Sequence, residues 1–244
     1  MNAVVSPLRA RNMEKRRERL LAEARLLLAH GGYEALNLRE LARQAGVTVP
    51  TIYNLIGRKE DVLLAVAAGV LSELEARTAT LPDADVLELA SAVVEESARL
   101  FEENADFYRA AFLAVEWLDQ GGQHHAEVVR LYAWIGQMID AGLAACRRAG
   151  LVVGAIPPAQ LTELITRSFR MNCRAWALGH RDIAAFRRDA LADLHVALCA
   201  DASAAFRATL IDRIAAPAAT ATRARTVRPK TMSKRSKTSG GAET

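Results

Sequence analysis

The stretch from Asn37 to Lys59, NLRELARQAGVTVPTIYNLIGRK, restricts the possible folds of this chain more than any other part of it. It predicts two short helices, Leu38 to Gln44 and Val49 to about Leu55. A tight turn joins them at Gly46, which adopts a positive φ that a residue with a Cβ resists. Two short helices around such a turn indicate a helix-turn-helix, in which the second helix enters the major groove of DNA.

Capping residues support this interpretation. Asn37 is the expected N-cap of the first short helix, with Glu40 placed as in a capping box. Thr48 is the expected N-cap of the second, with Pro50 in its first turn, where the missing N–H costs nothing. The alternative is an ordinary corner between two helices. The apolar seam between the two helices consists of Leu41, Ala42, Val47, Ile52 and Leu55.

The composition favours an all-α protein. Apolar residues make up 51 % of the 244 residues and aromatic residues only 5 %. Long stretches rich in Ala, Leu, Glu and Arg, with few clusters of β-branched residues, are typical of helices. No apolar run reaches the roughly 18 residues that a membrane span needs, and the basic N-terminal segment lacks the apolar region of a signal peptide. We therefore expect a cytoplasmic protein with no membrane partner.

The net charge of +4 conceals three regions of different sign. Residues 1–60 carry 11 Lys and Arg against 6 Asp and Glu, residues 61–216 carry 14 against 21, and residues 217–244 carry 7 against 1. Only the two basic ends suit a polyanionic partner. This distribution favours a DNA-binding head on an acidic body.

Apolar periodicity and helix-breaking residues predict about nine helices. The first spans about 13–30, and the two short helices of the motif follow. The remaining six are expected at 59–78, 85–104, 106–119, 124–149, 158–179 and 182–210. The predicted domains are a disordered basic arm at 1–12, a helix-turn-helix domain at 13–60, a larger helical domain at 61–215 and a disordered basic tail at 216–244.

This order of a basic first helix, the 37–59 motif, a long linking helix and a helical body resembles the tetracycline-repressor (TetR) family of bacterial transcription regulators. The resemblance covers about 16–66, roughly a fifth of the chain. Where the family usually carries a further aromatic or His and then Phe, this chain has Leu55 and Ile56. The matching residues are Gly32, Leu41-Ala42, Ala45-Gly46-Val47-Thr48, Thr51-Ile52-Tyr53 and Lys59.

The resemblance implies a ligand-responsive regulator, most often a repressor. Such a protein binds double-stranded DNA at a pseudo-palindromic operator as a homodimer, and a small-molecule effector in the body modulates its affinity. It is a bacterial cytoplasmic protein that associates with the nucleoid when bound to DNA.

The family's DNA contacts can be placed on matching positions. Hydroxyl and ammonium groups suit phosphate contact, and the expected phosphate-binding residues are Thr48, Thr51, Tyr53 and Lys59. The N-terminal part of a recognition helix faces base edges, where we expect Val49, Pro50 and Asn54. Asn37 and Arg39, around the start of the first short helix, complete the predicted DNA-binding set.

The implied effector site lies in the body, where an apolar cavity with a few polar groups is the usual composition of such a site. For each candidate the alternative is an ordinary place in the core. The residues expected to bind the ligand are Tyr108, Phe112, Glu116, Trp117, Trp134, Met138, Phe169 and Asn172. The last two predicted helices are expected to form the homodimer by four-helix packing. The predicted interface consists of Ala175, Leu178, Gly179, Leu191, Leu194 and Leu198.

Two other functions compete with a regulator. An enzyme is not expected, because the sequence has no Ser/His/Asp arrangement with supporting context, no Gly-rich phosphate loop and no paired carboxylates at metal spacing. Neither His124-His125 nor the three widely spaced cysteines have a metal-ligand spacing, so we expect no metal and no cofactor. The stronger alternative is a largely sequence-independent, nucleoid-type DNA binder that relies on the basic tail. The tail could equally serve only to keep the protein soluble.

Overall fold

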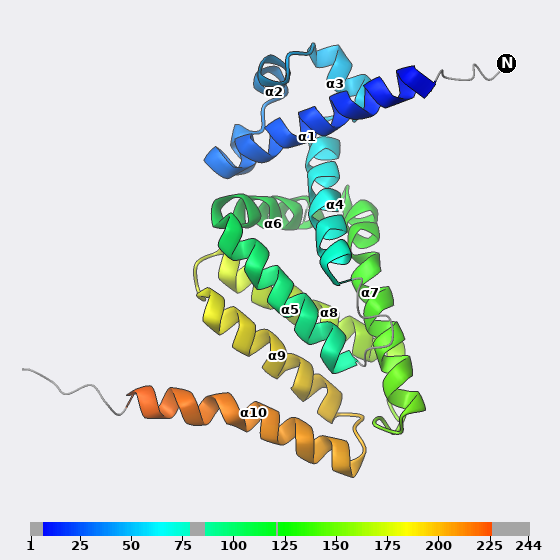
Figure 1. The fold of residues 1–244 in the computed structure, drawn as a ribbon, viewed down its shortest axis with the longest axis vertical. Coiled ribbons are helices and arrows are strands. Elements are labelled where there is room, and N and C mark those ends of the chain that lie inside the picture. The colour runs from blue at the N-terminus through cyan, green and yellow to red at the C-terminus, as the bar shows by residue number, and fades with distance from the viewer. Residues whose placement is uncertain (1–6, 79–85, 121, 226–244) are drawn as a thin grey trace, which may run out of the picture.

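The computed structural model describes residues 7–78, 86–120 and 122–225. Ten helices lie within these ranges, and the expected all-α fold is confirmed. They are α1 Pro7–Ala35, α2 Leu38–Ala45, α3 Val49–Leu55, α4 Lys59–Thr78, α5 Val86–Glu103, α6 Ala105–Gln120, α7 His125–Arg148, α8 Pro158–Ala177, α9 Ile183–Cys199 and α10 Ala204–Arg225. Helices α1 to α3 form a head, α4 runs from it into the body, and α6 lies across the body beneath α1 (Figure 1).

The caps of the two short helices form largely as predicted. The side chain of Asn37 accepts a hydrogen bond from the backbone N–H of Arg39 at 2.8 Å, and Gly46 ends α2 with a φ of 65°. Thr48 caps α3 by accepting from the N–H of Thr51. The second half of the capping box is absent, because the Glu40 carboxylate bonds to side chains one turn later in its own helix.

A tight turn fixes where α4 begins. The backbone N–H of Arg58 donates to the Asp61 carboxylate at 2.7 Å, which caps the helix from its first turn. Gly57 precedes it with a φ of 134°, a conformation that side chains disfavour, and a Cβ there would lie 2.7 Å from Cγ of Asp61. These local constraints explain why α4 starts at Lys59, as predicted.

The helix count was predicted one too low, because the expected helix at 182–210 is broken. Between α9 and α10, Asp201 is buried, and its carboxylate accepts hydrogen bonds from the N–H groups of residues 154, 155 and 156. Val152 and Ala202 form an antiparallel bridge beside it. The loop after α7 therefore supplies the partners of residues 201–203, and the chain turns there instead of remaining helical.

The two ends of the chain also differ from the prediction. Helix α1 begins at Pro7, so residues 7–12 of the expected disordered arm are helical. Helix α10 continues to Arg225, so the expected tail is helical over 216–225. Residues 1–6 and 226–244 lie outside the described residues.

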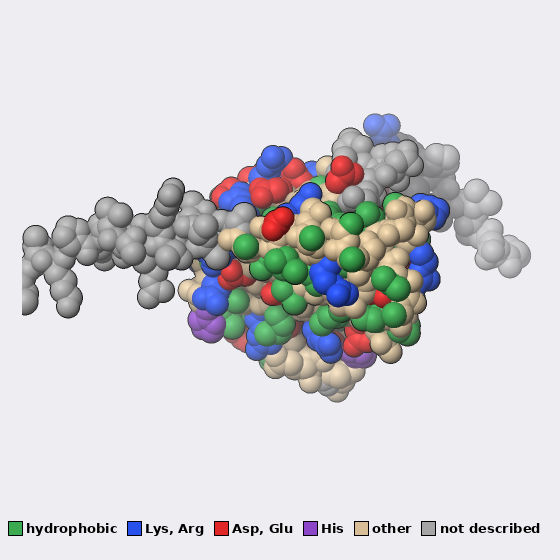
Figure 2. All heavy atoms as spheres, turned by 90° about the horizontal axis from the view of Figure 1, so that it is seen from below, with side chains coloured by type: hydrophobic (Ala, Val, Ile, Leu, Met, Phe, Trp, Pro, Cys, Tyr) green, Lys and Arg blue, Asp and Glu red, His purple; other side chains and the backbone are tan. Residues whose placement is uncertain are grey.

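Two apolar clusters form the core, and the first of them joins the head to the body. The first extends from Leu20, Leu41 and Ile52 in the head to the body, where the rings of Phe101 and Trp176 stack with centroids 3.9 Å apart. The second joins α5, α7, α8, α9 and α10. At the α10 end of the body, basic side chains are scattered singly among apolar and acidic ones (Figure 2). None of the described helices is both long and apolar enough to span a bilayer.

Candidate DNA-binding face and body cavity

The residues predicted to contact DNA lie around the start of α2, along α3 and at the start of α4. Exposed side chains are what a DNA-binding face requires, and Tyr53 is 52 % exposed although it is aromatic. Six of the nine are exposed, namely Asn37, Arg39, Thr48, Pro50, Tyr53 and Asn54, and three are partly buried, namely Val49, Thr51 and Lys59. The buried side of α3 is held by Ile52, which is fully buried.

Besides Asn37, whose side chain caps α2, three of these side chains already have partners in the head. The hydroxyls of Thr48 and Thr51 hydrogen-bond to each other at 2.9 Å, which leaves both with further capacity to donate or accept. Nζ of Lys59 lies 3.8 Å from the ring centroid of Tyr33, within the range of a cation–π interaction. Leu55 and Ile56, the aliphatic residues at usually aromatic positions, are partly buried against the head core.

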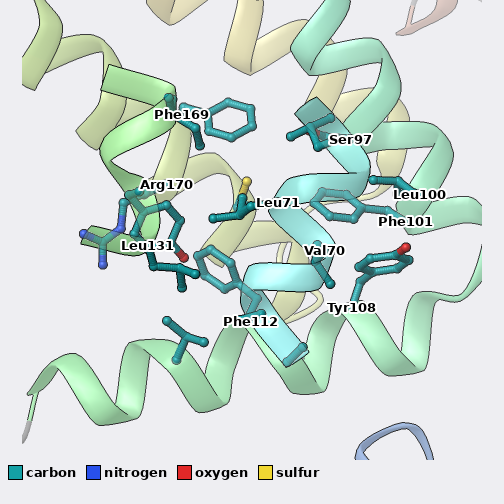
Figure 3. Close-up of a pocket in the computed structure, with 17 residues that line it drawn as sticks. Val70, Leu71, Ser97, Leu100, Phe101, Tyr108, Phe112, Leu131, Phe169 and Arg170 are labelled. Atoms are coloured by element: carbon teal, nitrogen blue, oxygen red, sulfur yellow. The ribbon is translucent and has the colours of Figure 1, made fainter. Parts of the chain in front are cut away.

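An apolar cavity of about 80 Å³ lies in the body. Helices α4, α5, α6, α7 and α8 supply its walls, and side chains such as Leu71 and Phe112 converge on it from different helices (Figure 3). Its polar lining includes Ser97, Tyr108 and Tyr132. Burial raises the pKa of the Tyr132 phenol and of the Cys173 thiol, so both groups are neutral at pH 7.

The charged residue in the lining is compensated by carboxylates. Nη2 of Arg170 donates to the Asp119 carboxylate at 3.0 Å and to Glu116, which also pairs with Arg174 at 3.6 Å. The guanidinium group of Arg170 points away from the middle of the cavity (Figure 3) and lies over the ring of Tyr132. The cavity therefore favours apolar, uncharged groups.

Only part of the predicted ligand set lines this cavity. Tyr108, Phe112 and Phe169 do, and Met138 lines an adjoining cavity of about 30 Å³ together with Phe169. The other four do not line either cavity: Glu116 pairs with arginines, Trp117 is exposed, Trp134 packs against both apolar clusters, and Asn172 donates to Asp193 at 2.7 Å.

Sequence reasoning missed the contribution of α4 to the cavity. Val70, Leu71 and Leu74 line it, and their spacing of three to four residues had indicated only that this side of the helix is buried. Ser97 is a second omission, since a buried serine among apolar neighbours in α5 is a signal for a polar group facing a cavity.

The predicted dimer residues fall into two groups. Leu194 and Leu198 are buried in the core of their own chain, so they are not available to a partner. Ala175, Leu178, Gly179 and Leu191 are exposed or partly exposed. Gly179 lies beyond α8, which ends at Ala177, and its φ of 75° closes the helix. Among the described residues no group of three or more His, Cys, Asp or Glu side chains is placed to hold a metal ion.

An exposed short helix on a three-helix head, joined by one long helix to a helical body with an apolar cavity, is the arrangement typical of helix-turn-helix DNA-binding regulators. Residues 20–66 match the sequence profile of the bacterial regulatory proteins of the tetR family. This match spans most of α1, the two short helices and the start of α4, and the resemblance to the tetR family rests on these residues.

One relative is the HTH-type transcriptional repressor KstR of Rhodococcus jostii (strain RHA1), which is 29 % identical over 92 residues. The match covers 37 % of this chain and 43 % of that repressor, so the chain spans less than half of its length.

Solved structures share the fold over most of this chain. A putative TetR-family regulator from Rhodococcus sp. has a TM-score of 0.63 at 14 % identity and covers 76 % of this chain and 99 % of its own. FadR of Thermus thermophilus, solved with lauroyl-CoA, has a TM-score of 0.61 at 18 % identity, over 75 % and 93 %. FadR of Bacillus subtilis, solved with stearoyl-CoA, has a TM-score of 0.60 at 18 % identity, over 72 % and 96 %.

Proposed function

We propose that this chain is a transcriptional repressor that binds a pseudo-palindromic operator as a homodimer and leaves it when a small molecule occupies the body cavity. The observation that carries the proposal is the position of α4. This helix begins at Lys59 on the DNA-binding face and lines the cavity with Val70, Leu71 and Leu74. A ligand that displaces this wall also displaces the head, and it lowers DNA affinity if it binds the displaced conformation more tightly.

The lining favours an effector with an apolar chain. An unoccupied volume of about 80 Å³ is well below the roughly 300–1,000 Å³ of typical ligand sites, so the walls must open to admit such a molecule. The acyl-CoA complexes of the two FadR proteins support a fatty acyl thioester as the class of effector. In this proposal the acyl chain enters between α4, α6 and α8, and the charged part of the molecule stays outside.

Exposed apolar residues on α8 and α9 support a dimer. Leu164 and Met171 in α8 and Leu178 directly after its end are spaced by seven residues and are 36 %, 57 % and 46 % exposed. In α9, Val196 is 58 % exposed. Such a surface on two adjacent helices is suited to four-helix packing against a second copy of the chain. In this proposal the exposed apolar residues take the place of Leu194 and Leu198 in the predicted interface.

Selection of bound fragments from genomic DNA tests the proposal. We expect one enriched pseudo-palindrome, with half-sites about one or two helical turns apart. Lauroyl-CoA and stearoyl-CoA, added at concentrations below micelle formation, should release the protein from this fragment, and coenzyme A alone should not. Enrichment of no sequence, or binding by a species of monomeric mass, contradicts the proposal.

The basic tail supports the alternative of a sequence-independent DNA binder. Residues 217–244 carry a net charge of +6, whereas the described face at the α10 end of the body has only scattered basic side chains (Figure 2). A chain that ends at Arg225 keeps α10 intact, loses five of the seven basic residues of this tail and thereby separates the two functions. Loss of all DNA binding favours the tail-driven alternative, and retention of one specific site favours the repressor.

A further inference from the structure

The junction between head and body contains an exposed tryptophan with a specific partner. Trp117, near the end of α6, is 57 % exposed, and its ring centroid lies 5.0 Å from that of Tyr33 in the head, at an interplanar angle of 39°. Tilted aromatic pairs at this distance are attractive beyond the area that they bury. The pair therefore joins α6 of the body directly to the end of α1.

Tyr33 in turn contacts the first two residues of α4. Its hydroxyl donates to the Glu60 carboxylate at 3.2 Å, and its ring lies 3.8 Å from Nζ of Lys59. Burial and the neighbouring Glu60 carboxylate raise the pKa of Tyr33 to about 12, so the phenol keeps the proton that it donates. The non-helical backbone at Gly31 and Gly32 interrupts α1 just before Tyr33 and sets the direction of this last turn.

We propose that Trp117 and Tyr33 position the ammonium group of Lys59 for its contact with a DNA phosphate, and that the body controls the affinity of the head through this Trp117–Tyr33–Lys59 stack. The proposal rests on the DNA-binding function proposed above. A free lysine side chain loses rotamer freedom when it binds a phosphate. The Tyr33 ring reduces that loss, because it restricts Lys59 before DNA arrives.

Helix α6 links the stack to the cavity. Ala111, Phe112 and Val115 line the cavity, and Trp117 follows Val115 by two positions, which turns it about 200° around the helix axis. One rigid helix therefore has a cavity wall on one side and the Trp117 contact on the other. Displacement of that wall by a ligand moves the Trp117 ring relative to Tyr33. This movement in turn changes the environment of Lys59.

A double-mutant cycle tests whether Trp117 acts through Lys59. The full-length protein and its variants are titrated against a labelled copy of the selected genomic fragment. We expect Trp117→Ala and Trp117→Leu to weaken binding about threefold to tenfold and Trp117→Phe to retain most of the affinity. In a Lys59→Ala background, Trp117→Ala should have no further effect. The matched control is Val129→Ala, an exposed apolar residue on α7, which should leave binding unchanged.

The thermal midpoint of each variant is measured in parallel, so that lost stability is distinguished from a lost DNA contact. Trp117→Leu serves the same purpose, because it retains an apolar side chain without the aromatic ring. An equal loss of affinity in both backgrounds overturns the proposal, because Trp117 would then act without Lys59. Unchanged affinity of Trp117→Ala also overturns it, and so does tighter binding, which would mean that Tyr33 holds Lys59 away from DNA. Failure of the proposed function is distinct, because the wild-type protein would then bind no fragment specifically.

Discussion

We expect the substitution Ala111→Leu to fill the body cavity. It should abolish the response to the ligand and leave DNA binding intact. Ala111 is buried on α6 and lines the cavity. Empty apolar space costs about 24 cal/mol per Å³, so a cavity of about 80 Å³ costs about 2 kcal/mol. The larger side chain should recover part of this, and we expect the free energy of unfolding to rise by up to about 2 kcal/mol.

The same substitution occupies the space that the apolar chain of an effector would enter. Affinity for the selected DNA fragment should therefore remain at the wild-type value, whereas release by lauroyl-CoA should be lost. Urea unfolding measures the first effect, and DNA titrations with and without lauroyl-CoA measure the second. Ala68→Leu is the matched control, because Ala68 is exposed on α4 and its enlargement should change neither quantity.

Two results would refute this reasoning. A fall of about 1–3 kcal/mol in the free energy of unfolding would indicate overpacking, and hence that the side chain at 111 cannot use the empty space. An unchanged response to lauroyl-CoA in a stable variant would show that the cavity is not the effector site.

Three further predictions concern the head, α4 and pH. Lys59→Ala and Tyr53→Phe should weaken binding to all DNA sequences about equally. Lys59→Ala should also lower the slope of log affinity against log salt concentration by about one for each lysine removed. A changed sequence preference would contradict phosphate contact. Gly57→Ala should destabilise the protein by about 1–3 kcal/mol, because φ is 134° and the added Cβ would clash with the Asp61 carboxylate. Gly69→Ala, in the middle of α4 with no neighbouring atoms near the added Cβ, should stabilise it by up to about 1 kcal/mol. Urea unfolding measures both effects. Burial and nearby Arg213 lower the pKa of His195. As the pH falls, the unfolded chain therefore takes up a proton at His195 before the folded protein does, and the free energy of unfolding should decrease below about pH 6.5. His195→Gln should flatten that part of the profile of stability against pH.

The two short helices of the head and the start of α4 could be predicted nearly to the residue because their signals are local, whereas α1 is longer at both ends than the predicted 13–30. Helix α3 has the predicted bounds, since Thr48 caps it and Pro50 occupies its first turn. The start of α4 at Lys59 likewise depends on contacts within four residues. Each of these choices is made by neighbours in the sequence, so tertiary structure is not needed to recognise them.

The body was predictable in its helices but less so in its site. Apolar spacing identifies the buried side of a helix without saying whether that side meets a cavity or another helix. Phe112 and Trp117 were therefore equal candidates in sequence, yet the first lines the cavity and the second lies exposed against Tyr33. The same limit explains why Leu194 was assigned to a dimer surface although it is buried in its own chain.

The sequence alone was therefore enough to predict the all-α fold and to locate the two short helices of the head, because caps and turn glycines act between near neighbours. Only the tertiary structure decided the break between α9 and α10, where Asp201 binds the backbone of residues about 45 positions earlier. It alone also decided the cavity and the Trp117–Tyr33–Lys59 stack. Their parts come from helices far apart in sequence, and no local pattern encodes which of them meet.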